Sequence, residues 1–212
     1  MENFDISVQR FDEFAEEYAS RFDNVSGYFE HFSHFCNMIK ADKPGILELA
    51  CGPGNVTRVL KNNFPESRIL AVDLAPKMIE IAQKALRDVD FRVMDVRQIS
   101  EISEKFDAVM CSFCLPFLSK EDAAKLITDC SILLNKDGVV YVSTMEGDET
   151  RAGFETTSFS GEAEIYFNYH RQADLDLAFM QSGFEIRQIK FQDYIEPDGS
   201  VTTDMIFIAV KR

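Results

Sequence analysis

The 212-residue sequence has few basic residues and no apolar run approaching the roughly 20 residues that a membrane-spanning helix requires. Its first residues, 1–5, also lack the basic and apolar regions of a secretory signal peptide. Lysine and arginine number 22 against 36 aspartates and glutamates, which gives a net charge of -14. Nucleic acids and anionic membranes both attract basic surfaces. We therefore expect a cytoplasmic protein with no nucleic-acid partner and no membrane partner.

Cysteine is also scarce, and its pattern argues against a disulfide framework. The five cysteines are an odd number and mostly lie in apolar contexts, which is typical of reduced, buried thiols: Cys36, Cys51, Cys111, Cys114 and Cys130. Cys111 and Cys114 form a C-x-x-C pair, but no second pair and no paired histidine completes a zinc site. The pair ends an apolar strand pattern rather than opening a helix, as a thioredoxin-like motif does. We expect neither a metal nor a redox centre.

Apolar runs and helical patterns alternate through the middle of the chain. The runs predict five strands, at 45–50, 68–73, 89–94, 106–113 and 139–144. Helices are expected between them, at 55–63, 76–87 and 120–134, the last capped by Ser119. Such alternation is typical of a mainly parallel α/β sheet covered on both faces.

The two ends of the chain depart from this alternation. Residues 1–40 carry aromatic residues at helical spacing, which predicts either a helical cap or a lid over a ligand cleft. A helix at 172–182 ends at Gly183, and two strand patterns, 184–195 and 201–210, follow it. The turn Glu196-Pro197-Asp198-Gly199-Ser200 joins them into an antiparallel hairpin.

We expect a single domain over 1–212, with a helical lid at 1–40 and a cofactor-binding core at 41–145. A helix and a hairpin occupy 171–212. Between them, 146–170 is polar, includes Thr156-Thr157-Ser158 and is too long for a simple connection. Loops of this kind on an α/β scaffold carry specificity, so this segment is expected to contact substrate.

Three acidic residues lie at or near the ends of the first three strands. Glu48 lies within the strand before the Gly52-x-Gly54 turn, and Asp73 and Asp95 lie at the next two strand ends. In a parallel sheet these positions share one edge, where α/β proteins bind nucleotide-like ligands. Asp73 is spaced as a ribose-binding acid, although it is also suited to cap a helix. Asp95 is equally compatible with a simple turn.

The glycine turn alone does not distinguish a dinucleotide from another cofactor. A nicotinamide dinucleotide places its pyrophosphate against such a turn, where Glu48 would repel it. The third glycine of G-x-G-x-x-G is also missing, because Thr57 stands at that position. Glu48 therefore favours a cationic ligand without phosphates.

The successive motifs resemble those of class I S-adenosylmethionine-dependent methyltransferases. They are Glu48-x-Ala50-Cys51-Gly52-x-Gly54, Asp73, Met94-Asp95-Val96 and Phe106-Asp107-Ala108-Val109. The family often has glycine where this chain has Ala50. The resemblance implies a three-layer Rossmann-like sandwich with a seven-stranded, mainly parallel sheet. Its strand order would be 3-2-1-4-5-7-6, with strand seven antiparallel.

The resemblance also implies roles for individual residues. Glu48 and the backbone near Ala50 and Gly52 would hold the methionine end of S-adenosylmethionine, and Asp73 would bind the ribose. The implied cofactor site comprises Tyr18, Glu48, Ala50, Gly52, Gly54, Asp73, Leu74, Met78, Asp95, Val96, Cys111 and Phe113. Met78 is alternatively a plain core residue, and the role of Tyr18 as a lid is the loosest of these assignments.

Methyl transfer from a sulfonium needs no general acid, so in-line positioning of the acceptor is the main requirement. His170 is the candidate catalytic base, with Glu146 as another. Tyr28, Phe117 and Tyr169 are candidate walls of the substrate pocket. No Asn-Pro-Pro-Tyr motif is present, so a small-molecule acceptor is expected, in a monomer or a homodimer. The alternatives are a nicotinamide-dependent oxidoreductase and a non-catalytic interaction module.

Overall fold

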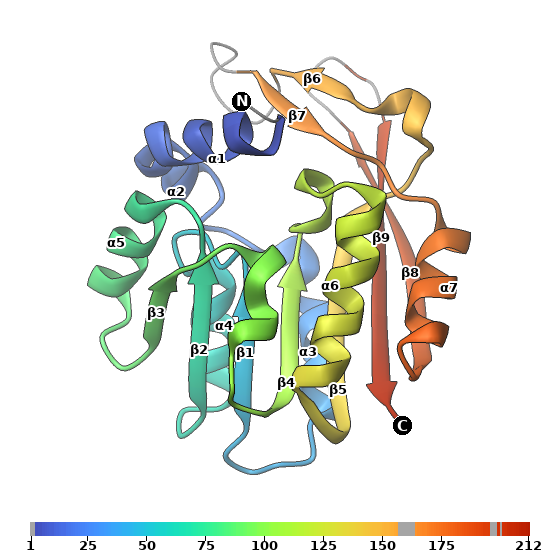
Figure 1. The fold of residues 1–212 in the computed structure, drawn as a ribbon. Coiled ribbons are helices and arrows are strands. Elements are labelled where there is room, and N and C mark those ends of the chain that lie inside the picture. The colour runs from blue at the N-terminus through green and yellow to red at the C-terminus, as the bar shows by residue number, and fades with distance from the viewer. Residues whose placement is uncertain (1–2, 157–163, 196–198, 200) are drawn as a thin grey trace.

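The computed structural model describes residues 3–156, 164–195, 199 and 201–212. A seven-stranded sheet forms its centre (Figure 1). The strands are β1 (Gly45–Leu49), β2 (Arg68–Asp73), β3 (Asp90–Val93), β4 (Phe106–Ser112), β5 (Leu134–Met145), β8 (Phe184–Ile195) and β9 (Val201–Lys211). Their order is β3-β2-β1-β4-β5-β9-β8. β1 to β5 pair in parallel, whereas β9 runs antiparallel to both β5 and β8. The predicted fold and strand order are therefore confirmed.

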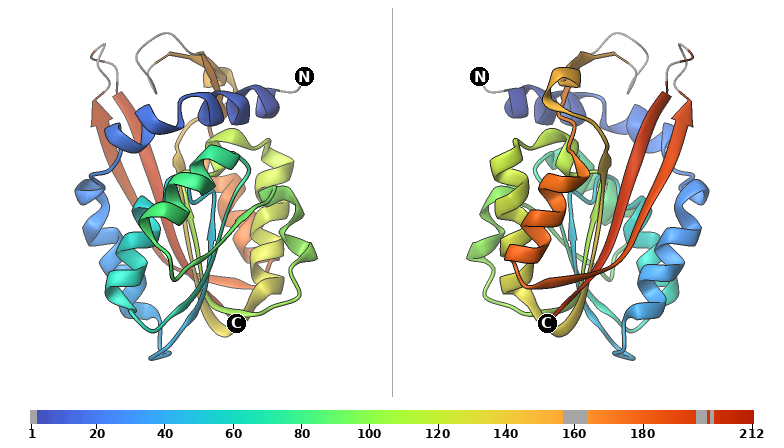
Figure 2. Two further views of the ribbon diagram at one scale, coloured as in Figure 1. Left: turned by 90° about the vertical axis from the view of Figure 1, so that its left-hand side faces the viewer. Right: turned by 90° about the vertical axis from the view of Figure 1, so that its right-hand side faces the viewer.

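Helices cover both faces of this sheet, as Figure 2 shows edge-on. The helices between the strands are α4 (Asn55–Asn63), α5 (Pro76–Ala85), α6 (Lys120–Leu133) and α7 (Gln172–Gln181). A 3-10 helix, η2 (Val96–Glu101), follows β3, and another, η3 (Leu115–Phe117), follows β4. All five residues of β1 are buried. Leu47 packs in the cluster that includes α6 and α7, while Ile46 packs in the cluster that includes α4.

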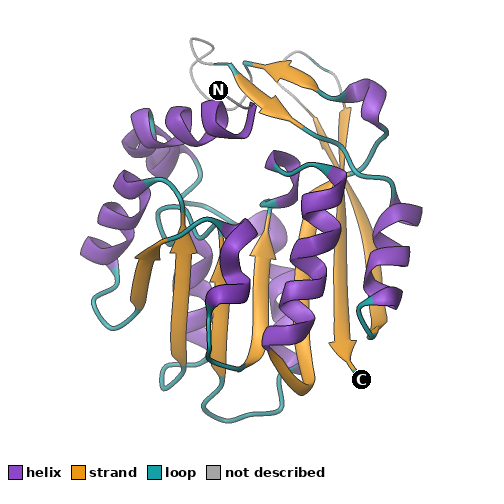
Figure 3. Cartoon of the chain, viewed as in Figure 1, coloured by secondary structure: helices purple, strands orange, loops and turns teal. Residues whose placement is uncertain are grey.

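The N-terminal region divides into two parts. α1 (Asn3–Glu13) and α2 (Ala15–Arg21) lie above the edge where the parallel strands end, as Figure 3 shows. η1 (Ser26–Tyr28) and α3 (Phe29–Met38) continue the chain, and Phe32 and Phe35 of α3 are buried against the sheet. Only the first half of the expected lid, 1–40, thus lies over the edge. The apolar spacing predicted helices but did not reveal which surface each would cover.

The expected substrate loop contains secondary structure of its own. It includes η4 (Glu149–Arg151) and a two-stranded antiparallel sheet of β6 (Gly153–Glu155) and β7 (Ile165–Phe167). Ser7 of α1 joins this sheet, because its Oγ donates to the Tyr166 carbonyl and accepts the Tyr166 N–H, both at 3.3 Å. Three-residue strands are too short to produce a periodic signal. Thr157, Ser158 and the other residues of 157–163 lie outside the described residues.

β5 begins earlier than the sequence pattern predicted. The strand starts at Leu134 rather than Val139, and its pairing with β4 shifts register between Phe106 and Ala108. Asp137 has a φ of 61°, and a Cβ at Gly138 would lie 2.9 Å from the Asn135 carbonyl oxygen. The Asp137-Gly138 turn signal is therefore a bulge within the strand. The hairpin turn between β8 and β9 lies outside the described residues except for Gly199.

Three further findings concern the whole of the described chain. All five cysteines are free and buried, as the sequence predicted. Within the described ranges, no helix is both long and apolar enough to cross a membrane, and no cluster of side chains is suited to hold a metal ion.

The predicted cap of α6 is present and can be tested. Ser119 Oγ accepts the Asp122 N–H at 3.1 Å. Ser119→Ala is expected to lower the free energy of unfolding by about 1 kcal/mol, because it leaves that N–H without its partner. This corresponds to a fall in Tm of roughly 2–4 °C for a chain of this size, measured by thermal unfolding. Ser119→Asp can also cap the helix and should retain the parent stability. An alanine variant as stable as the parent would contradict the prediction.

Candidate functional site

A cavity lies at the carboxyl edge of the sheet, beneath α1 and α2. It encloses about 690 Å³ of atom-free space, a figure that includes the open mouth. Its walls come from α1, α2, the turn after β1, the ends of β2 and β4, α5 and η2. The predicted residues that line it are Tyr18, Ala50, Gly52, Asp73, Leu74, Met78, Val96, Phe113 and Phe117. Residues from five different parts of the sequence therefore meet at one edge of the sheet.

The turn after β1 has an unusual backbone conformation. Ala50, Gly52 and Gly54 have φ values of 52°, 53° and 84°. Ala50 is the residue at which the methyltransferase pattern often has glycine, and its left-handed conformation gives the physical reason for that preference. A Cβ at Gly54 would lie 3.3 Å from the Ala82 Cβ. Gly54 is therefore required for the close approach of α4 to α5, outside the cavity wall.

Asp73 fixes the shape of this turn from the neighbouring strand. Its Oδ2 accepts the Gly52 N–H at 2.8 Å, and its Oδ1 accepts the Ala75 N–H at 2.9 Å. Burial raises the pKa of Asp73, and the backbone donors oppose that shift. A carboxylate has about four lone-pair positions, so both oxygens can accept further bonds from hydroxyl groups in the cavity. Asp73 thus makes the backbone bonds of a capping acid and also lines the cavity, and its role in ligand binding stays a prediction.

Glu48 is enclosed behind the turn. Its side chain is 2% exposed, and its Oε2 has no hydrogen-bond partner within the described residues. Its pKa is raised to about 8, chiefly by burial; hydrogen bonding from Thr57 opposes this shift, and the charge of Asp73 adds to it. Thr57, the residue that breaks the dinucleotide glycine pattern, is itself fully buried at 0% exposure. A buried carboxyl group with an unpartnered oxygen is suited to a nearby positive charge.

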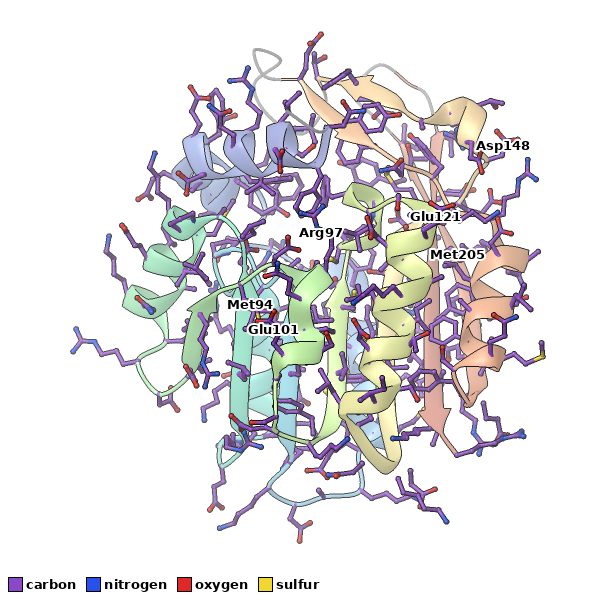
Figure 4. The ribbon with its side chains drawn as sticks, viewed as in Figure 1. Met94, Arg97, Glu101, Glu121, Asp148 and Met205 are labelled. Atoms are coloured by element: carbon purple, nitrogen blue, oxygen red, sulfur yellow. The ribbon has the colours of Figure 1, made fainter. Side chains whose placement is uncertain are left out.

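Asp95 makes its own contacts at the adjacent strand end. Its Oδ1 accepts the Arg97 N–H at 2.8 Å, and its Oδ2 accepts from the Arg97 guanidinium at 2.7 Å. The Arg97 guanidinium lies 3.9 Å from the centre of the Phe4 ring of α1, and Figure 4 labels it between η2 and α1. Phe4 lines the cavity, but Asp95 does not appear among the described residues of its wall. The turn role considered for Asp95 is therefore present, and its contact with a cofactor stays a prediction.

At the end of β4, the chain passes from the core into the cavity wall. Cys111 is fully buried in the core, while Ser112, Phe113 and Cys114 line the cavity. Phe113 has a φ of 55°, and its N–H bonds both the carbonyl oxygen and the Oγ of Ser143, at 3.2 and 3.0 Å. The left-handed backbone turns Phe113 toward the cavity. Cys111 precedes the residues of this segment that line the described cavity wall, so the predicted contact of Cys111 with the cavity is not present.

The residues predicted to act on substrate are divided among different environments. Phe117 lines the cavity. The Tyr169 hydroxyl donates to Glu155 at 2.8 Å, away from the described wall. His170 is 4% exposed and its Nε2 lies 2.8 Å from the Leu115 carbonyl oxygen. Burial lowers the pKa of His170, which favours a neutral ring that donates this bond. His170 is therefore bonded to a backbone carbonyl group and does not line the described cavity wall.

Several wall residues were not identified from the sequence. α1 contributes Phe4, Ser7, Val8 and Phe11, and α5 begins after Ala75, which also lines the cavity. The aromatic spacing of the first 22 residues was the available signal. It showed an apolar face but not that this face lies over the carboxyl edge of the sheet.

The site fits S-adenosylmethionine better than a dinucleotide. Asp73 is the charged side chain in the described cavity wall, and Glu48 lies behind it. A pyrophosphate would meet two acids, whereas a ribose and a positively charged amino acid moiety would be stabilised by them. Together with the strand order, this donor set defines the class I S-adenosylmethionine-dependent methyltransferases.

Comparison with known proteins identifies the same class. The model of the methyltransferase domain family matches residues 46–138. A demethylmenaquinone methyltransferase of Thermotoga maritima is 32% identical over 105 residues, which are 50% of this chain and 45% of that protein. A putative methyltransferase of Invertebrate iridescent virus 6 is 26% identical over 194 residues, 82% of this chain and 70% of that protein. The chain therefore spans less than half of the first relative's length.

Solved structures share the fold across the whole chain. The magnesium protoporphyrin IX methyltransferase of Synechocystis PCC 6803, solved with bound S-adenosylmethionine, has a TM-score of 0.74 at 16% identity. The match covers 100% of this chain and 98% of that one. The same methyltransferase was also solved with S-adenosylhomocysteine. At this level of identity the likeness establishes the fold alone.

Proposed function

We propose that this protein binds S-adenosylmethionine in the cavity and transfers its methyl group to a small-molecule acceptor. The observation that carries the proposal is the donor set of the cavity. Asp73 faces an otherwise uncharged wall, and the buried Glu48 lies behind the glycine turn. That set suits a ribose and a positive charge, and it offers no basic side chain for a phosphate in the described wall.

When bound, the cofactor supplies a methyl group on a positively charged sulfur. Asp73 would accept hydrogen bonds from the ribose hydroxyls while it holds the Gly52 N–H in place. Tyr18 would close the site from α2, since the Cε1 of its ring lies 3.9 Å from the position of a Cβ on Gly52. Phe113 and Phe117 would exclude water beside the acceptor. Positioning of the acceptor then supplies the main catalytic effect.

A small acceptor agrees with the enclosure of the cavity. α1 lies over it and is joined to β7 through Ser7 and Tyr166. The name of the Thermotoga maritima relative also specifies a small molecule, demethylmenaquinone. The cavity wall is mostly apolar and aromatic, which favours an acceptor with an apolar body.

Thermal shift with two cofactors distinguishes the proposal from its alternatives. Saturating S-adenosylhomocysteine, at about 100 times its Kd, is expected to stabilise the protein by about 2.7 kcal/mol. This corresponds to a rise in Tm of roughly 5–10 °C for a chain of this size. NADH should leave the Tm unchanged. Stabilisation by NADH alone would instead support an oxidoreductase, and binding of S-adenosylhomocysteine without turnover of any acceptor would support an interaction module.

A further inference from the structure

A hydrogen-bonded pair of polar side chains, one partly and one fully buried, lies beside the cavity, on the α3 side of the sheet. The Tyr28 hydroxyl donates to Asp204 Oδ2 at 2.5 Å, and Asp204 is 3% exposed. Asp204 pairs in register with Met145, the last residue of β5, so it lies at the same carboxyl edge as the cavity. Burial and the neighbouring Asp204 carboxylate raise the pKa of Tyr28. Tyr28 therefore stays a neutral donor next to an acidic group.

A second hydroxyl group in this region lacks a partner. The Tyr141 hydroxyl is buried and has no hydrogen bond within the described part of the chain. Tyr141 lies two residues before Ser143 on β5, so both side chains lie on one face of the sheet. Asp204 faces the same side, because directly opposed residues of an antiparallel pair share a face. Buried hydroxyl groups are normally bonded, and an orphan one indicates a water or ligand that completes the group.

Phe113 separates this cluster from the cavity. Its ring lines the cavity and meets the Tyr28 ring edge-on, with 5.3 Å between the ring centres. Its left-handed φ of 55° is uncommon for a bulky residue, and such conformations are concentrated at functional sites. The pair of Tyr28 and Asp204 therefore lies one aromatic ring away from the place where a cofactor would be bound. A displacement of that ring would be needed to connect them.

The charges around the cavity indicate which acceptors fit. The described wall contains no lysine or arginine. The residues outside the described ranges, at 1–2, 157–163, 196–198 and 200, include none either. An acceptor with a carboxylate or phosphate would lose its hydration here without gaining a basic partner. An ammonium group would instead meet Asp204, with the Tyr28 oxygen as a second acceptor.

We propose that Tyr28 and Asp204 form the acceptor subsite and that they select an amine carried on an apolar or aromatic body. This inference rests on the proposed methyltransferase function and names the substrate class of the same site. Asp204 provides the charge, Tyr28 orients the carboxylate, and Phe113 supplies the apolar wall between the subsite and the cofactor. The pair determines specificity and is separate from the residues that bind the cofactor.

Three probes with one skeleton and different head groups test the subsite. They are phenethylamine, 2-phenylethanol and phenylacetate, titrated by calorimetry into the protein saturated with S-adenosylhomocysteine. We expect the amine to bind at least tenfold more tightly than either of the others. Asp204→Asn should lower the affinity for phenethylamine at least tenfold and remove this preference. Tyr28→Phe should lower it by a smaller factor, because the carboxylate remains.

The control is Asp193→Asn, which removes the same charge from an exposed position on β8, where Asp193 accepts a bond from Thr203. It should retain the full preference for the amine. S-adenosylhomocysteine affinity should stay within twofold of the parent in all three variants, which also shows that each one is folded. Three results would overturn the inference. They are equal affinity of the parent for phenethylamine and phenylacetate, no binding of the amine by the parent, and binding of the amine by Asp204→Asn as tight as that by the parent. If the parent protein itself does not bind S-adenosylhomocysteine, the result counts against the proposed function instead.

Discussion

Replacing Asp73 by alanine is expected to weaken S-adenosylhomocysteine binding by about 100-fold. A hydrogen bond to a charged group contributes about 1.5–3 kcal/mol, and 2.7 kcal/mol corresponds to a factor of 100 in affinity. The side chain also holds the Gly52 and Ala75 N–H groups at 2.8 and 2.9 Å. The variant should therefore lose both the ribose contact and the shape of the turn. Calorimetric titration with S-adenosylhomocysteine measures the first effect.

Stability measurements separate these two contributions. Leaving a buried donor unpaired costs about 1–3 kcal/mol, so Asp73→Ala should also unfold at lower urea concentration. Asp73→Asn keeps one oxygen acceptor and should lose less stability while still binding the cofactor poorly. Asp88→Ala is the matched control, because Asp88 is an exposed acid paired with Lys61 at 2.9 Å. An Asp73→Ala protein that binds S-adenosylhomocysteine like the Asp88 variant would remove Asp73 from the site.

The sequence determined the central architecture because its signals are local. β1 is fully buried and apolar apart from Glu48, and Pro76 and Ser119 mark helix starts that the structure retains. The acids at the strand ends were informative for the same reason. In a parallel sheet, a position at the end of a strand fixes a position in space. Asp73 therefore lies at the cavity as predicted.

Positions that depend on packing between distant segments were harder to predict from the sequence. Asp95 is at the predicted strand end, yet Arg97 engages it and Phe4 covers that arginine. Nothing in the local pattern specifies contact between residues 4 and 97. Asp204 is a single acid in an apolar strand, and only the pairing of β5 with β9 brings it to the carboxyl edge. His170 looked suited to catalysis because it follows an aromatic loop, but its ring is bonded to the Leu115 carbonyl.

Glu48 should make both stability and cofactor binding depend on pH. Its pKa is about 8 in the folded protein, against an ordinary value of 4.5. Between these values the folded chain holds a proton that the unfolded chain has lost. The contribution of Glu48 to stability is therefore fully present below about pH 4.5 and is lost as the pH rises through 8. The slope is at most about 1.4 kcal/mol per pH unit. Urea unfolding at several pH values should show this fall in the parent and not in Glu48→Gln.

Binding should respond in the opposite direction. A positive charge near the turn favours the ionised form of Glu48, so binding of S-adenosylhomocysteine, which retains the amino group, releases a proton. Affinity should rise with pH between about 5 and 8, by up to about tenfold per unit where one proton is released. Glu48→Gln should bind weakly with little pH dependence, as measured by calorimetry in two buffers of different ionisation enthalpy. The same pH dependence in Glu48→Gln would assign the proton to another group, such as Asp73, whose pKa burial also raises.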